Sequence, residues 1–116
     1  MAIATTAEKN SLATKYGADT TFAAIFTADP GTSGTVTGEV TGGSPAYARK
    51  AISWGAPSGG VVTATVTFDV PAGTTVTFAG VCSASTGATL LDKVAVTSQA
   101  FATQGTYALT LTYTQT

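Results

Sequence analysis

The sequence contains no histidine and few charged residues, with five basic and six acidic side chains among 116 residues. Without an imidazole the chain cannot form a Ser-His-Asp triad, a Cys-His pair, an H-E-x-x-H zinc site or a histidine general base. Charged residues make up 9% of the chain, against about 25% in an ordinary soluble domain. These shortages direct the interpretation away from catalysis and toward a structural or interaction protein.

Nucleic-acid binding and membrane insertion are also disfavoured. The net charge is -1, and a nucleic-acid partner requires many phosphates to be neutralised. No apolar run approaches the roughly 18 residues of a membrane-spanning helix. The first residues, MAIATTAEKNSL, have neither a basic nor an apolar signal region, so we expect no signal peptide and synthesis in the cytoplasm.

Cysteine occurs once, as Cys82, so the fold cannot depend on an intramolecular disulfide. We expect Cys82 to be a small buried hydrophobe, because no neighbouring cation or helix start is evident. What the chain has in quantity is threonine, with 25 residues, and hydrophobic residues, which make up 44%. The length predicts a single domain over residues 1–116 with a core of its own.

A short helix is predicted over residues 6–16. Thr5 and Glu8 have the spacing of a capping box, and Leu12 and Tyr16 lie one turn apart on a shared face. Gly17 fits the position after the helix end, where a left-handed backbone favours glycine.

After residue 17 the hydrophobic period changes to two, which indicates strands. The clearest strand, 61–70, alternates apolar residues with threonine, as a half-buried antiparallel strand does. Further strands are predicted at 20–27, 35–40, 47–54, 74–83, 89–96 and 106–114, with turns at 28–31, 55–60 and 85–87 and a hairpin turn at 71–73 that joins the strands 61–70 and 74–83. About seven to eight such strands predict an antiparallel, jelly-roll-like β-sandwich with a short N-terminal helix.

No catalytic, cofactor-binding or metal site is predicted. Nothing in the sequence brings two of the acidic residues together as an acid–base pair; these are Glu8, Asp19, Asp29, Glu39, Asp69 and Asp92. The glycine-rich loop between Asp29 and Glu39 lacks both a calcium-loop pattern and the lysine of a phosphate-binding loop. We therefore expect no cofactor.

An interface is the remaining candidate. Tyr47, Arg49 and Lys50 combine an aromatic ring with the only adjacent basic pair, and such residues anchor protein contacts. Trp54 is expected in the core. A chain with so little charge has few means of keeping its strand edges apart from other strands. We therefore expect much of the surface to be covered by copies of the chain or by a larger assembly.

One long segment resembles a known group of proteins. FTADPGTSGTVTGEVTGGSPAYARKAISWGAPSGG is similar to a segment of small tailed-phage proteins, especially those of phages that infect actinobacteria. The matching positions are Phe26 to Gly31, Glu39 to Gly43, Tyr47, Arg49, Lys50 and Ile52 to Trp54. Downstream, VTFDVPAGT and SASTGATLLDK also match. Phe26 departs from the pattern, because many of those proteins have histidine there.

The resemblance implies a virion structural protein without enzymatic activity, most often a minor tail or tail-fibre component. Its partners would be itself and other virion proteins. Two alternatives stay open, a capsid decoration protein and a carbohydrate-binding module that recognises the host-cell surface. The second requires exposed, clustered aromatic residues among Tyr47, Trp54, Tyr107 and Tyr113. A hydrolase that uses Asp69 and Asp92 is the last alternative.

Overall fold

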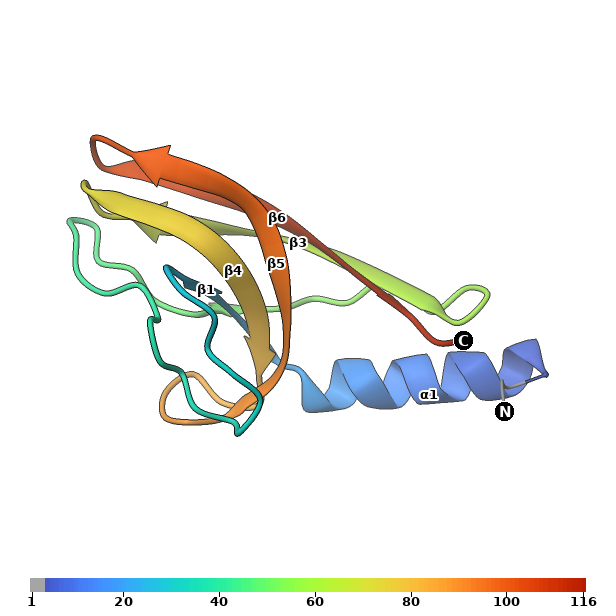
Figure 1. Cartoon of the computed structure of the whole chain (residues 1–116). Helices are drawn as coiled ribbons and strands as arrows, with labels where there is room; N and C mark the ends of the chain where they lie inside the picture. The colour runs from blue at the N-terminus through green and yellow to red at the C-terminus, as the bar shows by residue number, and fades with distance from the viewer. Residues whose placement is uncertain (1–3) are drawn as a thin grey trace.

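The computed structural model describes residues 4–116 as one helix and six strands in two antiparallel sheets (Figure 1). The elements are α1 (Thr6–Asp19), β1 (Phe22–Phe26), β2 (Lys50–Ala51), β3 (Val61–Val70), β4 (Thr74–Cys82), β5 (Leu90–Phe101) and β6 (Gly105–Thr114). The predicted mainly β fold with an N-terminal helix is confirmed, with six strands instead of seven to eight. Residues 1–3, the start of the segment in which no signal peptide is expected, lie outside the residues that the structure describes.

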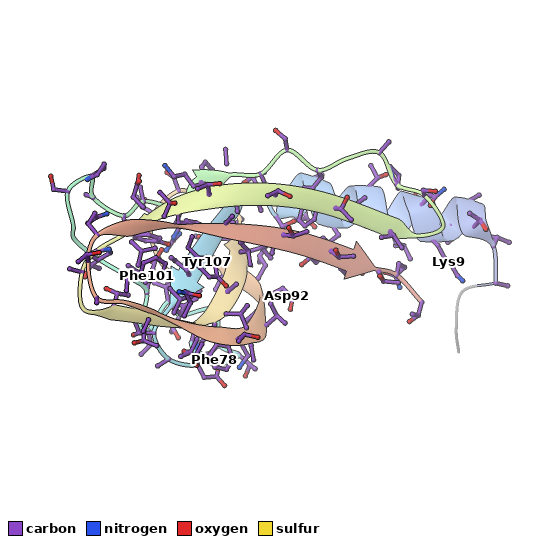
Figure 2. The ribbon with its side chains drawn as sticks, turned by 90° about the horizontal axis from the view of Figure 1, so that it is seen from above. Lys9, Phe78, Asp92, Phe101 and Tyr107 are labelled. Carbon is purple, nitrogen blue, oxygen red and sulfur yellow. The ribbon has the colours of Figure 1, made fainter. Side chains whose placement is uncertain are left out.

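Four of the strands form one long β-hairpin that is folded over on itself. β4 pairs with β5 across the predicted turn at 85–87, and β3 pairs with β6 outside them. The register runs on from one pair to the next, because Val70 lies opposite Gly105 and Thr74 lies opposite Phe101. The ribbon therefore bends once, and its two halves become the two sheets of the fold (Figures 1 and 2).

The turn at 71–73 is the bend of this ribbon, and its prediction as a hairpin turn is wrong. β3 and β4 are consecutive parts of one side of the ribbon and belong to different sheets. Gly73 has a φ of 79°, which allows the chain to turn sharply. Its N–H still donates to the carbonyl of Phe101 at 2.7 Å, so the ladder continues through the corner.

The second sheet is completed by residues from the first half of the chain, in the order β2-β1-β4-β5. β1 confirms the strand predicted at 20–27 and is buried on both faces. The strand predicted at 47–54 is wrong in extent, since only Lys50–Ala51 pairs. The strand predicted at 35–40 is reduced to a single bridge between Phe26 and Glu39, because Gly38 within it and Gly34 and Gly42 beside it turn the chain with positive φ.

The main core lies between the two sheets. Its buried members come from β1, β3, β4 and β6 and from the loop before β2, and they are Ala23, Ile25, Val40, Val66, Phe68, Val70, Val76, Ala79, Val81, Leu109 and Leu111. A second cluster, formed by Ala24, Phe26, Cys82 and Leu90, lies on the other face of β1. The long loop after β1 covers it with Val36. Cys82 is fully buried there, as predicted.

The helix is longer than predicted and ends at Asp19. The prediction that Gly17 ends it is wrong. Gly17 is an interior position where the helix approaches the indole of Trp54, and a Cβ there would lie 3.2 Å from the Cδ1 of Trp54. The helix start is as expected, with the N–H of Glu8 donating to the hydroxyl of Thr5 at 3.4 Å. Leu12 is exposed, so Ala13 supplies the buried contact in its place.

The molecule is elongated, with principal extents of 47 × 25 × 23 Å. The two sheets diverge from the bend, and α1 runs beneath the far ends of β3 and β6 (Figure 1). Asn10 fixes this contact, because its side-chain oxygen accepts a hydrogen bond from the N–H of Gly60 at 2.8 Å. The helix therefore holds the open end of the ribbon.

Candidate assembly surface and aromatic cleft

The predicted interface residue Arg49 is buried inside the subunit. Its guanidinium forms a fork with Glu39 at 2.8 and 2.9 Å, and their side chains are 3% and 15% exposed. Arg49 also donates to the carbonyls of Ala84 and Gly87 and to the hydroxyl of Thr89. It therefore ties the long loop between β1 and β2 to the turn between β4 and β5.

Tyr47 belongs to the same network. Its hydroxyl donates to Glu39 at 2.8 Å and accepts from the N–H of Ile25 at 3.3 Å. Burial, and then the hydrogen bond to Glu39, raise the pKa of the Tyr47 hydroxyl far above its usual value. Lys50 is the accessible member of the predicted interface, with its Nζ 4.0 Å from Asp69. The interface role of these three residues stays a prediction.

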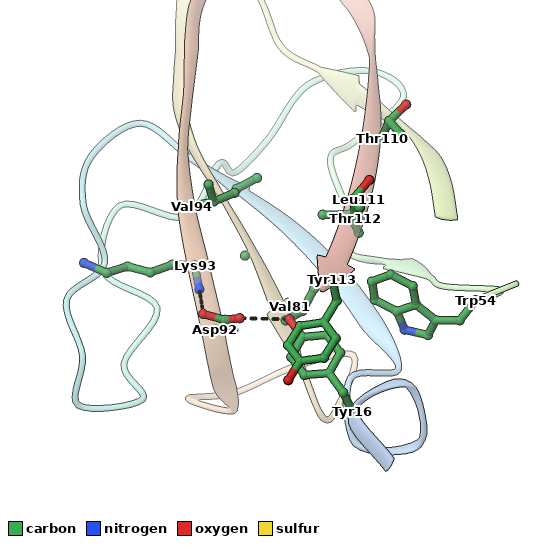
Figure 3. Close-up of a pocket in the computed structure, with 12 residues that line it drawn as sticks. Tyr16, Trp54, Val81, Asp92, Lys93, Val94, Thr110, Leu111, Thr112 and Tyr113 are labelled. Carbon is green, nitrogen blue, oxygen red and sulfur yellow. Dashed lines mark hydrogen bonds between the residues drawn. The ribbon is translucent and has the colours of Figure 1, made fainter. Parts of the chain in front are cut away.

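A cleft of about 310 Å³ lies between β5 and β6, on the side where the sheets diverge (Figure 3). Tyr16 and Tyr113 stack at its mouth with ring centroids 3.7 Å apart, and Trp54 meets the Tyr16 ring edge-on at 5.8 Å. Val94 is 53% exposed beside them. Two strands are too narrow to cover a four-stranded sheet, so the inner face of β5 stays partly open at this place.

The polar groups of Tyr16 and Trp54 in the cleft are fixed by internal hydrogen bonds. The Tyr16 hydroxyl donates to Asp92 at 2.9 Å, and burial together with this contact raises the pKa of Tyr16. The indole N–H of Trp54 donates to the carbonyl of Thr20 at 2.9 Å. The cleft therefore presents rigid aromatic rings with one carboxylate at their edge, an arrangement that suits contact with an amphipathic partner.

The free edge of β6 is a second accessible feature. The N–H of Gly55 donates to the carbonyl of Thr63 at 2.9 Å, so the backbone polar groups of Thr63 point away from β6. Thr63 lies opposite Thr112, so the backbone groups of Thr112 likewise point away from β3. Along an antiparallel ladder, residues whose backbone groups point to the partner strand alternate with residues whose groups point away from it. The outward groups of β6 thus belong to every second residue, namely Thr106, Ala108, Thr110, Thr112 and Thr114. Among residues 4–116 no strand pairs with this edge.

The outer face of the β3–β6 sheet is almost entirely threonine. Thr63 and Thr65 lie opposite Thr112 and Thr110, and all four side chains are exposed. The hydroxyls of Thr65 and Thr110 approach to 3.5 Å. The threonine outer face predicted for these strands is thus confirmed, and Asp69, near the bend, is the charged residue that shares this face.

The acidic residues are separated and mostly paired with cations. Asp29 binds Lys93, a contact that together with the N–H of Gly31 lowers the pKa of Asp29. Asp19 pairs with Lys15 at 2.7 Å. Residues 4–116 contain no cluster of three or more potential metal ligands, and no helix there is long and apolar enough to span a membrane.

Sequence reasoning missed Tyr16 and Asp92 as members of one site. They lie 76 positions apart, and only the placement of α1 under the ribbon brings them together. The four aromatic residues considered as sugar contacts do not form one cluster. Trp54 and Tyr113 line the cleft, whereas Tyr47 and Tyr107 pack against the core. The pairing of Tyr113 with a helix residue has no local signal in the sequence.

The fold and these surfaces define a small β-structural protein whose accessible features are a strand edge, a threonine face and an aromatic cleft. The chain belongs to the phage fibre family described as Podophage GP4 fiber I protein gp80, whose family model matches residues 6–114. No curated protein and no solved structure is significantly similar to it. Membership supports a virion structural role, a virion location and contacts with other virion components.

Proposed function

We propose that the protein is a minor component of the phage tail, at its tip or in its fibres, and that it acts through protein–protein assembly. The observation that carries this proposal is the match to a fibre family over nearly the whole chain. An actinobacterial host is part of the proposal and rests on the sequence resemblance alone.

The surface supports assembly as the mode of action. The chain has a net charge of -1 and exposes an uncharged strand edge beside a threonine face. Proteins that stay monomeric commonly protect such edges with lysine, proline or bulges. Lys50, on the short edge strand β2, is the basic residue we propose for contact with a neighbouring virion protein.

The copy number in purified particles tests the proposal. Quantitative mass spectrometry, scaled to the major capsid protein, is expected to give a small fraction of the capsid copy number. Gold-labelled antibodies are expected to mark the tail tip or fibres in electron micrographs. A copy number comparable with the capsid protein and label on the head would favour capsid decoration instead. Absence of the protein from particles would contradict both virion roles.

Carbohydrate binding is a second candidate function, favoured by the cleft. Trp54 and Tyr113 lie together there, next to the carboxylate of Asp92, and sugars commonly meet aromatic rings beside polar groups. A glycan array and titration of the Trp54 fluorescence would test it. Tyr113→Ala is expected to remove binding, whereas Tyr107→Ala, outside the cleft, is expected to retain it. Equal binding by both variants would contradict a sugar site in the cleft.

A further inference from the structure

The sequence of β6 reads almost the same in both directions. From residue 106 to 114 it is TYALTLTYT, which is centred on Thr110. At equal distances on either side of the centre, Leu109 matches Leu111, Tyr107 matches Tyr113, and Thr106 matches Thr114. Ala108 and Thr112 are the one unequal pair. A strand of this kind presents the same residues to a second copy that runs antiparallel to it.

We propose that two copies of the chain associate through their β6 edges, antiparallel, with Thr110 opposite Thr110 on a two-fold axis. The proposal rests on the assembly role proposed above and names one of its contacts. Such an interface is isologous, because the same edge serves on both copies. It joins two β3–β6 ribbons into one four-stranded sheet, as in other cases of strand addition.

The hydrogen-bonding direction of β6 agrees with this register. Thr110 is one of the residues whose backbone N–H and C=O point to the free edge, as derived from the bond between Gly55 and Thr63. Placed opposite its own copy, Thr110 exchanges both hydrogen bonds across the axis. The same holds for Ala108 with Thr112 and for Thr106 with Thr114. Every outward backbone group of the strand thus has a partner.

Charge and side-chain pattern select β6 over the other edges. Gly105–Thr114 contains no charged residue and no proline, so two copies meet without repulsion or a blocked donor. β5 carries Asp92 and Lys93, and the outer edge of β3 already binds Gly55. In the proposed register leucine lies opposite leucine and tyrosine opposite tyrosine on the inner face, where cross-strand apolar pairs stabilise a sheet.

The full-length chain, studied by analytical ultracentrifugation over a range of concentrations, is expected to reach twice the mass of one chain. Thr110→Pro removes an outward N–H without breaking a bond to β3. We expect this change to raise the dimer dissociation constant at least about tenfold. Thr110→Val keeps the N–H and the branched side chain, and we expect it to remain a dimer. The proposal would be overturned if the natural chain were monomeric or trimeric. It would also be overturned if Thr110→Pro and Thr110→Val dimerised equally well, or if both variants were monomers.

Cysteine cross-linking tests the register without depending on Thr110→Pro. Directly opposed residues that exchange hydrogen bonds have Cα atoms about 5.5 Å apart, within the range of a disulfide. Under mild oxidation Thr110→Cys is expected to give covalent dimers. Ala108→Cys is expected to give none alone, because its two copies would lie about 14 Å apart along the strands. It is expected to cross-link when mixed with Thr112→Cys. Cross-linking by Ala108→Cys alone would contradict the register.

The location of the protein in particles is measured separately. If the chain is found at the tail tip or fibres while Thr110→Cys yields no covalent dimer, the β6 contact is wrong and the tail proposal stands. If cross-linking occurs but the protein is absent from particles, the tail proposal is wrong and the self-association stands.

Discussion

The almost completely buried guanidinium of Arg49 donates hydrogen bonds to both carboxylate oxygens of Glu39. The pair fixes the long loop against the turn between β4 and β5. We expect Arg49→Ala to lower the free energy of unfolding by about 3–5 kcal/mol, because it leaves the buried Glu39 charge without its partner. Urea denaturation followed by circular dichroism measures this change.

The exposed pair of Lys15 and Asp19 provides the matched control. Both side chains are largely in water, and the pair spans one helical turn. We expect Lys15→Ala to change the free energy of unfolding by no more than about 0.5 kcal/mol. A loss of similar size in Lys15→Ala and Arg49→Ala would contradict the structural role assigned to Arg49.

Gly80 lies in the middle of the four-stranded sheet, where the neighbouring strands leave no space. A Cβ there would lie 2.6 Å from Leu90 Cδ1 and 3.0 Å from the carbonyl oxygen of Asp92. Since the second contact is with backbone, we expect Gly80→Ala to destabilise the fold by about 1–3 kcal/mol. Gly55→Ala, whose Cβ meets only one atom at 3.6 Å, is the control and should leave the melting temperature almost unchanged. Equal melting temperatures for the two variants would contradict this packing.

Alkaline pH is expected to destabilise the protein through its buried tyrosines. The folded pKa of Tyr47 lies above that of the unfolded chain, mainly because of burial. The neutral hydroxyl therefore stabilises the fold fully below a pH of about 10, and this contribution is lost as the pH rises further. Melting temperatures measured across this range should fall less steeply in Tyr47→Phe than in the natural chain. Parallel pH profiles would argue against the contribution of Tyr47.

The thiol of Cys82 is expected to report on opening of the second core cluster. The side chain is fully buried, and burial raises the pKa of the thiol. A thiol reagent should therefore react slowly with the native protein and rapidly in denaturant. Arg49→Ala should speed the native reaction, since Arg49 holds the turn that follows Cys82. Fast reaction of the natural chain without denaturant would show that the cluster is open.

The local elements of the fold could be predicted from the sequence more readily than their partners. Alternation of apolar residues and threonine located 61–70 and 106–114, because that signal depends only on which face is buried. The turn at 71–73 has the composition of a hairpin turn. Whether such a turn reverses a strand or bends a ribbon depends on the pairing of β3 with β6, more than thirty residues apart.

The same difference between local signals and long-range contacts applies to the surfaces. The shortage of charge pointed to assembly, whereas the role of Arg49 inside the subunit depends on Glu39, Ala84 and Gly87, which the fold brings together. Gly17 shows that sequence position alone can mislead. Its position suits the end of a helix, but the close contact with Trp54 explains why a glycine is needed inside the helix.

The continuous register of the folded ribbon has a consequence for how the chain folds. Once the turn at 85–87 brings β4 and β5 together, each further pair closes only a short additional loop. The entropy cost of joining β3 to β6 is thus spread over many small steps, although these strands are distant in sequence. We expect zippering from that turn toward the chain ends, with α1 docking last, so that substitutions in the β4–β5 hairpin slow folding most.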